Sequence, residues 1–279
     1  MTPERHSVLI TGCSSGIGLD AARTLTARGW RVLATCRQPA DCARLTAEGL
    51  ESFPLDLADE TGLATAAAEA LDRTGGRLDA LVNNGAFAIP GATEDLPRAA
   101  LRAIFETNLF GQLDLTNRLL PAMRACGSGR IVMVSSVLGL VAAPWRGAYV
   151  ASKFALEGLT DTLRLELSGS GISVSLVEPG PIATPFRRNA IPHFERHVDW
   201  RGSPHRAAYE ATLIPRLYAD DGRADRFQRL PAAVSAVIVA ALESRRPRAR
   251  YAVTVPARTA GLLRRLLPAA ALDRLLRGR

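Results

Sequence analysis

Residues 7–18 read Ser7-Val8-Leu9-Ile10-Thr11-Gly12-Cys13-Ser14-Ser15-Gly16-Ile17-Gly18, an apolar run followed directly by a glycine-rich loop. The apolar run predicts a buried β-strand, and residues 17–28 continue with the periodicity of a helix that ends at Gly29. At such a turn, glycines allow close backbone approach and the helix N-terminus can face a pyrophosphate. The glycines stand at the first, fifth and seventh positions of the loop, unlike the usual fingerprint, but its position predicts a dinucleotide-binding turn.

Strand-like and helix-like segments alternate along the rest of the chain. Further strands are expected near residues 30–35, 53–55, 78–83, 130–135, 172–177 and 251–255, and helices near residues 39–48, 60–73, 97–124, 148–167 and 231–243. Continuous β-branched runs separated by helices indicate a parallel sheet that is covered on both faces. The sequence therefore predicts a doubly wound, Rossmann-like α/β fold in one catalytic domain, residues 1–257, followed by a basic tail, residues 258–279.

Composition is that of an ordinary globular protein, with 47% hydrophobic and 22% charged residues among 279. The four cysteines show no metal-binding spacing, so we expect free thiols and no metal. The first residues run straight into the fold without the apolar region of a secretory signal, and no stretch reaches the roughly 18 apolar residues of a membrane span. We expect a cytoplasmic protein.

The net charge is +8, and a positive charge of this size suggests nucleic acids or membrane surfaces as partners. Arginines crowd residues 187–229 and 245–279, whereas Lys153 is the only lysine. A preference for arginine over lysine often reflects genome composition, and a nucleic-acid role would rest on charge alone. We therefore expect no nucleic-acid partner.

The second predicted strand ends in Thr35-Cys36-Arg37. Enzymes that prefer NAD usually carry an acidic residue there, which holds the ribose 2′-hydroxyl. An arginine would instead stabilise a 2′-phosphate, and the hydroxyls of Ser15 and Thr35 could add donors. A plain surface arginine is the alternative, but beside a dinucleotide site the pattern favours NADP over NAD.

Tyr149 and Lys153 are four residues apart on a predicted helix and so share one face. A nearby ammonium is expected to lower the tyrosine pKa from about 10 toward neutrality. Such a tyrosine can protonate a carbonyl oxygen or deprotonate an alcohol. A solvated helix face is the alternative, which the uniqueness of Lys153 weakens. Ser136 follows a predicted strand, where its hydroxyl could bond a substrate oxygen or simply cap the chain.

Together these motifs resemble the short-chain dehydrogenase/reductase superfamily over residues 7–255. The glycine loop, Asp56, Asn83-Asn84-Gly85-Ala86, Asn108, Ser136, Tyr149, Lys153 and Pro179-Gly180 follow the family's order. The chain looks closest to bacterial NADP-dependent aldehyde and ketone reductases, which are similar to 17β-hydroxysteroid and retinol dehydrogenases. The family usually reads Asn-Asn-Ala-Gly where this chain has Asn83-Asn84-Gly85-Ala86, which leaves the local backbone geometry open.

The resemblance implies four catalytic residues. Tyr149 would be the general acid/base, and Lys153 would lower its pKa and bind the nicotinamide ribose. Ser136 would orient the carbonyl, and Asn108 would hold a water that links Lys153 to solvent.

The resemblance also implies a set of cofactor contacts. These are Gly12, Ser14, Ser15, Gly16, Ile17, Gly18, Thr35, Arg37, Asp56, Leu57, Asn83, Gly85, Asn108, Tyr149, Lys153, Pro179, Gly180, Ile182 and Thr184. Asp56 would bond the adenine amine, and Asn83 with Gly85 would line the adenine-ribose side. Thr184 would bond the carboxamide, with backbone contacts from Ile182.

Residues 185–230 match the family's variable substrate lid. The aromatic residues Phe186, Phe194, Trp200 and Tyr209 could line an apolar pocket for long-chain aldehydes, steroids or retinoids. The lid also contains His193, His197 and His205, whose spacing predicts surface histidines and no metal site.

The tail, residues 258–279, alternates leucine pairs with arginines and predicts an amphipathic helix that is interrupted near Pro268. It could lie on an anionic membrane surface, or pack on the body or a second subunit. The resemblance also suggests a homodimer or homotetramer through the helices at residues 97–124 and 148–167.

The sequence thus predicts an NADP(H)-dependent oxidoreductase that reversibly reduces an aldehyde or ketone, on a lipophilic substrate. The alternative is a catalytically silent NADP(H)-binding regulatory protein, which would have no need of Ser136, Tyr149 and Lys153 together. A structural dimer module would not explain the glycine loop.

Overall fold

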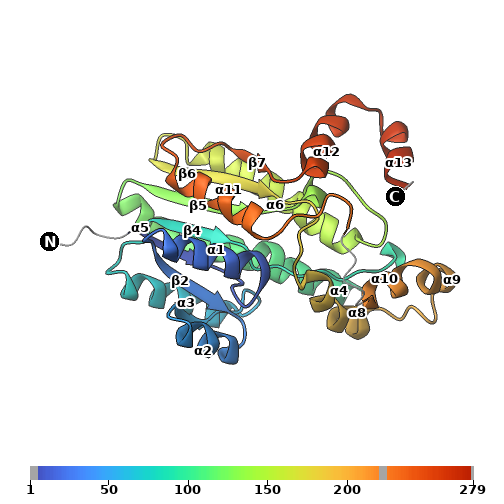
Figure 1. The fold of residues 1–279 in the computed structure, drawn as a ribbon, viewed down its shortest axis with the longest axis horizontal. Helices are drawn as coiled ribbons and strands as arrows, with labels where there is room; N and C mark the ends of the chain where they lie inside the picture. Colours follow the sequence, from blue (N-terminus) through green and yellow to red (C-terminus); the bar gives the residue numbers. More distant parts are fainter. Residues whose placement is uncertain (1–5, 220–224, 278–279) are drawn as a thin grey trace.

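The computed structural model describes residues 6–219 and 225–277, and a parallel sheet of seven strands forms its centre (Figure 1). The strands are β1 (Ser7–Ile10), β2 (Arg31–Cys36), β3 (Glu51–Pro54), β4 (Ala80–Asn83), β5 (Gly129–Val134), β6 (Ile172–Glu178) and β7 (Arg250–Ala252). Their order is β3-β2-β1-β4-β5-β6-β7, so the direction of winding reverses between β1 and β4. The predicted doubly wound fold is confirmed, and its switch point is where such sheets bind ligands.

Helices cover both faces of the sheet. One face carries α1 (Gly16–Ala27), α2 (Pro39–Ala47) and α11 (Ala232–Glu243), and the other carries α3 (Glu60–Arg73), α5 (Gly111–Ala125) and α6 (Gly147–Glu166). Along β1, Val8 and Ile10 pack toward the first group and Leu9 toward the second, because successive strand side chains point to opposite faces. Burial on both faces explains why the strands read as continuous apolar runs.

The predicted helix over residues 97–124 is interrupted. It forms α4 (Arg98–Phe105), a π-helical turn, η2 (Glu106–Phe110), and then α5. A Cβ atom on Gly111 would lie only 1.9 Å from the Leu57 carbonyl oxygen, so the helix passes against the end of the β3–α3 connection. Local hydrophobic periodicity cannot predict this contact, because it joins residues that are far apart in the sequence. The π turn carries Asn108 into the interior, and such turns are frequent at functional sites.

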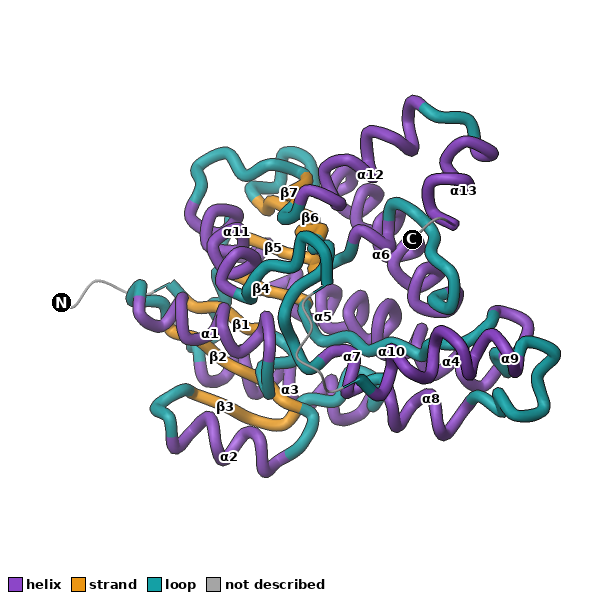
Figure 2. Tube along the Cα trace, turned by 45° about the vertical axis from the view of Figure 1, so that its right-hand side comes forward, coloured by secondary structure: helices purple, strands orange, loops and turns teal. Residues whose placement is uncertain are grey.

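The predicted lid folds into short helices beyond the carboxyl ends of the strands. They are α7 (Phe186–Asn189), α8 (Ile191–His197), α9 (Arg206–Ala208) and α10 (Ile214–Tyr218). They gather around α4 in both views (Figures 1 and 2), with Phe194 and Tyr209 fully buried among them. Residues 220–224 of the predicted lid, 1–5 of the predicted domain and 278–279 of the tail lie outside the described residues.

The tail forms α12 (Val255–Leu266) and α13 (Ala269–Arg277), with the predicted break at Pro268. Helix α12 begins before the predicted boundary and packs on the body, since Ala257 is buried and Arg264 donates to the Leu140 carbonyl at 2.9 Å. In the part of the chain that the structure describes, no helix has the length and apolar character needed to cross a membrane. All four cysteines are free thiols.

Candidate active site

The β1–α1 loop is tied to the end of β4 at the switch point. The Thr11 hydroxyl oxygen accepts hydrogen bonds from the backbone N–H groups of Asn84 and Gly85, at 3.0 and 2.9 Å. In return, the Asn84 side-chain amide donates to the Thr11 carbonyl at 2.9 Å. Sequence reasoning quoted Asn84 but gave it no role, although its place directly after a buried strand could have suggested one.

At two positions of this loop, Gly12 and Gly18, there is no room for a side chain. Gly12 adopts φ +73°, and a Cβ atom there would lie 2.8 Å from the Gly85 Cα atom. A Cβ atom on Gly18 would lie 2.3 Å from the Gly12 carbonyl oxygen. Helix α1 starts at Gly16, so the N–H groups of its first turn lack helical partners and face the loop. The residues present therefore fit the pyrophosphate of a dinucleotide.

Other predicted cofactor contacts converge on the same edge. A Cβ atom on Gly16 would lie 3.0 Å from the Thr184 methyl carbon, so the loop after β6 packs directly against the glycine loop. Leu57 is buried beside Gly85. The Asp56 carboxylate accepts from the Ala58 N–H at 3.0 Å. The remaining members of the predicted set on these loops are Ser14, Ser15, Ile17, Pro179, Gly180 and Ile182.

Two residues that are predicted to contact the cofactor, Thr35 and Asn83, have side chains that hydrogen bond within the protein instead. The Thr35 hydroxyl is fully buried and donates its one proton to the Ile10 carbonyl at 3.1 Å, so it is no donor for a 2′-phosphate. The Asn83 amide is also fully buried and donates to the Thr116 hydroxyl at 2.9 Å, beneath α5. Both expectations are corrected for these side chains, because alternation along a strand sends them inward. Arg37, directly after β2, is exposed, and its contact with a 2′-phosphate stays a prediction.

The structure brings Ser136, Tyr149 and Lys153 together where β5 ends and α6 begins. Lys153 is 1% exposed, and its ammonium donates to the Val134 carbonyl at 2.8 Å. The same nitrogen lies 5.7 Å from the centre of the Tyr149 ring. The Ser136 hydroxyl accepts from the Leu138 N–H at 3.1 Å and lies near enough to Tyr149 to act on its pKa. The predicted pair is therefore a buried cluster and not a solvated helix face.

Burial sets the pKa values of this cluster. It raises the pKa of Tyr149 to about 12, although the hydrogen bond with Ser136 and the charge of Arg146 act to lower it. Burial lowers the pKa of Lys153 to about 8. The expected lowering of the Tyr149 pKa by Lys153 is therefore wrong for this structure, since loss of hydration of the phenolate outweighs the nearby cations. Tyr149 holds its proton at neutral pH and is suited to donate it.

Asn108, in the π turn, forms hydrogen bonds both to the segment that follows β4 and to α6. Its side-chain oxygen accepts from the Phe87 N–H at 3.0 Å, and its amide donates to the Phe87 carbonyl and the Ser152 hydroxyl at 2.9 and 3.1 Å. Ser152 in turn donates to the Tyr149 carbonyl at 2.9 Å. The oxygen keeps one lone pair that a water could use. The relay of protons through such a water stays a prediction.

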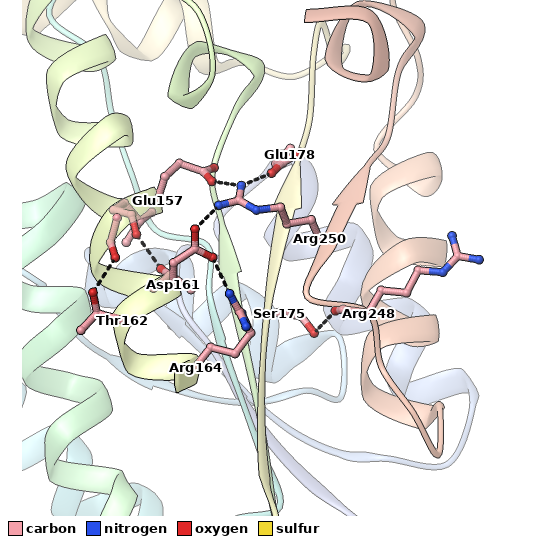
Figure 3. Close-up of polar contacts among 11 residues, drawn as sticks. Glu157, Asp161, Thr162, Arg164, Ser175, Glu178, Arg248 and Arg250 are labelled. Atoms are coloured by element: carbon pink, nitrogen blue, oxygen red, sulfur yellow. Dashed lines mark hydrogen bonds and ion pairs between the residues drawn. The ribbon is translucent and has the colours of Figure 1, made fainter. Parts of the chain in front are cut away.

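A network of charges that sequence reasoning missed is centred on Arg250 (Figure 3). Arg250 donates to Glu157, to Glu178 at 2.6 Å and to Asp161 at 2.5 Å, joining β7 to β6 and α6. Glu157 is 6% exposed and lies one helical turn beyond Lys153. Burial raises the pKa of Glu157 and Arg250 opposes that shift, while the Glu157 charge raises the pKa of Lys153 against burial.

The four lid aromatics belong to one apolar cluster with Tyr149, and they differ in how they contribute to it. Phe194 and Tyr209 are core residues, and the Tyr209 hydroxyl donates to Asp95 at 2.8 Å. Trp200 packs toward Tyr209, with ring centres 6.3 Å apart. Phe186 alone contacts the reactive cluster, since its ring lies edge-on to Tyr149 at 5.4 Å.

The predicted surface histidines differ in their surroundings. His205 is exposed beside Glu94, whereas the His193 ring is half-buried and stacks on Phe87 at 4.0 Å. Burial lowers the pKa of His193 to about 4, so its ring is neutral at physiological pH. Across the residues that are described, no group of three or more His, Cys, Asp or Glu side chains could hold a metal ion.

A dinucleotide loop and a buried Ser–Tyr–Lys cluster at one edge of a Rossmann-like sheet define a nucleotide-dependent oxidoreductase. The sequence profile of the family described as "short chain dehydrogenase" matches residues 6–193. The chain belongs to the short-chain dehydrogenase/reductase superfamily.

Individual relatives agree with this assignment. "Uncharacterized oxidoreductase YbbO" of Escherichia coli strain K12 is 42% identical over 274 residues, 98% of this chain and 95% of that protein. Human "Retinol dehydrogenase 8" is 38% identical over 196 residues, 67% of this chain and 62% of that protein. A crystal structure of a variant actinorhodin polyketide ketoreductase with NADPH superposes with a TM-score of 0.72 at 29% identity, covering 91% of this chain and 97% of that one.

Proposed function

We propose that this chain is an NADP(H)-dependent reductase that converts an aldehyde or ketone into an alcohol, with Tyr149 donating the proton. The observation that carries the proposal is the buried cluster in which Tyr149, with a pKa of about 12, lies beside Ser136 and 5.7 Å from the Lys153 ammonium. This cluster lies at the same sheet edge as the glycine loop. Bound NADPH would supply the hydride.

The side chains of this chain divide the remaining work. Ser136 and Tyr149 would both donate hydrogen bonds to the carbonyl oxygen and so hold the carbonyl carbon in place. As negative charge develops on that oxygen, the Tyr149 proton moves to it, because an alkoxide is a stronger base than a phenolate. The Lys153 ammonium then stabilises the phenolate that is left behind, at a distance that its bond to Val134 fixes. The reverse sequence oxidises an alcohol.

The preference for NADP rests on Arg37. It is exposed directly after β2, at the position where an acidic residue would hold a 2′-hydroxyl. A second arginine, Arg44 of α2, lies beside the glycine loop, where it donates to the Ser14 carbonyl at 2.7 Å and pairs with Asp41 and Glu48 at 3.5 and 3.0 Å. A 2′-phosphate would gain charge-assisted hydrogen bonds from this side of the site.

A lipophilic substrate is the second part of the proposal. Retinol dehydrogenase 8, by its name, acts on a lipophilic alcohol, and here the Phe186 ring lies against Tyr149 within the proposed lid, residues 185–230. A screen of NADPH and NADH oxidation across aliphatic aldehydes, aromatic aldehydes, retinal and ketosteroids tests both parts. We expect turnover with NADPH on at least one class. Tight NADPH binding with no turnover on any class would instead indicate the silent regulatory protein.

We also propose a homodimer or homotetramer through the α4–α5 and α6 surfaces. Three large apolar side chains are exposed there, Leu101 at 38%, Phe110 at 50% and Leu165 at 68%. Water-exposed groups of this kind often mark an interface. Light scattering after size exclusion decides the point, and a monomer at micromolar concentration would contradict it.

We retain peripheral membrane contact of a cytoplasmic protein as a proposal for the tail. Leu262, Leu266 and Leu275 are 57, 69 and 52% exposed on helices that also carry arginines. An anionic bilayer could accept such a surface. Since α12 packs on the body, replacing the three leucines by glutamine is a cleaner change than deletion. Unaltered sedimentation with anionic liposomes would contradict the proposal.

A further inference from the structure

A cluster of guanidinium groups lies on the lid side of Tyr149. Arg146 directly precedes α6, three residues before the tyrosine. Arg187 of α7 and Arg216 of α10 both form ion pairs with Asp225, at 3.0 and 2.9 Å. One carboxylate thus serves two guanidinium groups, and Arg146 adds a third cation to the same neighbourhood.

The cluster adjoins the reacting groups. Phe186, the residue before Arg187, places its ring edge-on to Tyr149 at 5.4 Å. Arg146 is near enough to Tyr149 for its charge to act on the phenol. The charges of Arg187, Arg216 and Asp225 act in turn on Arg146. The cluster therefore borders the place where a substrate carbonyl would meet the Tyr149 hydroxyl.

The backbone that presents Arg146 is strained. Trp145 adopts φ +64°, a left-handed conformation that is rare for a bulky residue. Its ring packs against Tyr209 at 4.8 Å, and its carbonyl accepts from the Gly91 N–H at 3.1 Å. These contacts hold the turn in place. Strain of this kind concentrates at functional sites, where it fixes a neighbouring side chain.

Arg146 lacks a partner for its charge. Among residues 6–219 and 225–277, no carboxylate forms an ion pair with it. Burial and, to a smaller extent, the neighbouring charges of Arg216 and Arg187 together lower the pKa of Arg146 to about 10, with only partial relief from Asp225. A half-buried cation among like charges is costly to the fold unless an anion binds beside it.

We propose that Arg146, flanked by Arg187 and Arg216, binds an anionic group of the substrate, so that the site takes carbonyl compounds that carry a carboxylate. The inference rests on the proposed reductase function and narrows its substrate class. Phe186 contacts the apolar part between the carbonyl and the carboxylate, and the three guanidinium groups receive the charged end. Such a substrate is amphiphilic, which reconciles the apolar ring at Tyr149 with the excess of positive charge around it.

The test compares two aldehydes that differ only in charge, 4-carboxybenzaldehyde and 4-methylbenzaldehyde, with saturating NADPH. The wild-type protein should favour the carboxylate in kcat/KM. Arg146→Gln should reduce the ratio of the two kcat/KM values by roughly 10- to 100-fold, the effect of one lost charge-assisted interaction. Arg146→Lys should restore part of it. Arg188→Gln removes the same charge from an exposed position of α7 and should leave the ratio unchanged.

Each contrary outcome points to a different failure. A wild-type ratio near one, or a ratio that Arg146→Gln leaves intact, overturns the anion site. Weaker NADPH binding in Arg146→Gln at an unchanged ratio would assign the cluster to the cofactor and also overturns it. If neither aldehyde is reduced, the screen across the other substrate classes decides the proposed function, separately from the anion site. In that case calorimetry of 4-methylbenzoate against 4-methylbenzyl alcohol, on the NADPH-loaded protein and on Arg146→Gln, still decides the matter. Binding of the benzoate that Arg146→Gln does not weaken overturns the proposal.

Discussion

Lys153 follows Tyr149 by four residues and Arg146 precedes it by three, and the two charges have different surroundings. Lys153 donates to a backbone carbonyl and has Glu157 one turn away, in a network where Arg250 meets three carboxylates. Arg146 instead has the charges of Arg187 and Arg216 acting on it, which the charge of Asp225 only partly offsets.

The difference indicates what each charge is for. A cation that must be present at every turnover is held by groups of the protein itself, so its position and protonation do not depend on which substrate enters. A cation that is left without an internal partner gains most when a ligand supplies the anion. We therefore assign Lys153 to the reaction and Arg146 to the choice of substrate.

Lys153→Met gives the largest expected effect. It removes the ammonium that stabilises the phenolate while keeping an unbranched apolar stem. Turnover should fall on the order of 10²–10⁴-fold for charged and neutral aldehydes alike, the usual weight of a lost proton-transfer group. Steady-state kinetics on the matched pair measure it. A change in the carboxylate-to-methyl ratio like that of Arg146→Gln would break the distinction between the two cations.

Arg37→Asp extends the comparison to the cofactor end of the site. Arg37 is exposed and, like the half-buried Arg146, forms no ion pair within the described residues, so it is free to bind the 2′-phosphate. The substitution should lower the NADPH-to-NADH preference in kcat/KM by roughly 10- to 100-fold without altering the preference between aldehydes. Arg246→Asp, in the α11–β7 connection, is the matched control. An unchanged cofactor ratio would remove Arg37 from the phosphate site.

Glu157→Gln gives the smallest effect and tests the internal partner of Lys153. The Lys153 pKa of about 8 means that its ammonium is lost as pH rises through that value, so reduction should decline there. The Glu157 charge raises this pKa, and its removal should shift the decline to lower pH for both aldehydes. Asp161→Asn, which also loses a bond to Arg250, should leave the profile in place. A profile that Glu157→Gln does not move would show that the network has no influence on Lys153.

Local pattern was enough to predict the sheet but not the packing between layers. The strands are buried on both faces, so their apolar runs stand out in the sequence, and the doubly wound order follows from their alternation with helices. The π turn at Glu106–Phe110 stands next to a contact of this second kind, the close approach of Gly111 to Leu57. Likewise, apolar character alone could not tell that Phe194 and Tyr209 enter the core of the lid while Phe186 faces Tyr149.

Part of the candidate site was equally accessible to sequence reasoning. Spacing placed Tyr149 and Lys153 on one helix face, and the end of a strand placed Ser136 near them. The direction in which the pKa of Tyr149 is shifted was predicted wrongly, because burial is a property of the whole fold. The pairing of Arg250 with Glu157 joins residues 93 positions apart, so no local motif could show it.

The most direct test of the account is Tyr149→Phe, which removes the proton donor and keeps the ring beside Phe186. Stopped-flow NADPH oxidation with any aldehyde that the wild-type protein reduces, together with titration of NADPH binding, separates chemistry from binding. We predict that turnover falls at least on the order of 10²-fold while the NADPH dissociation constant changes little. Turnover within a few fold of wild type would contradict the role of Tyr149 as the proton donor.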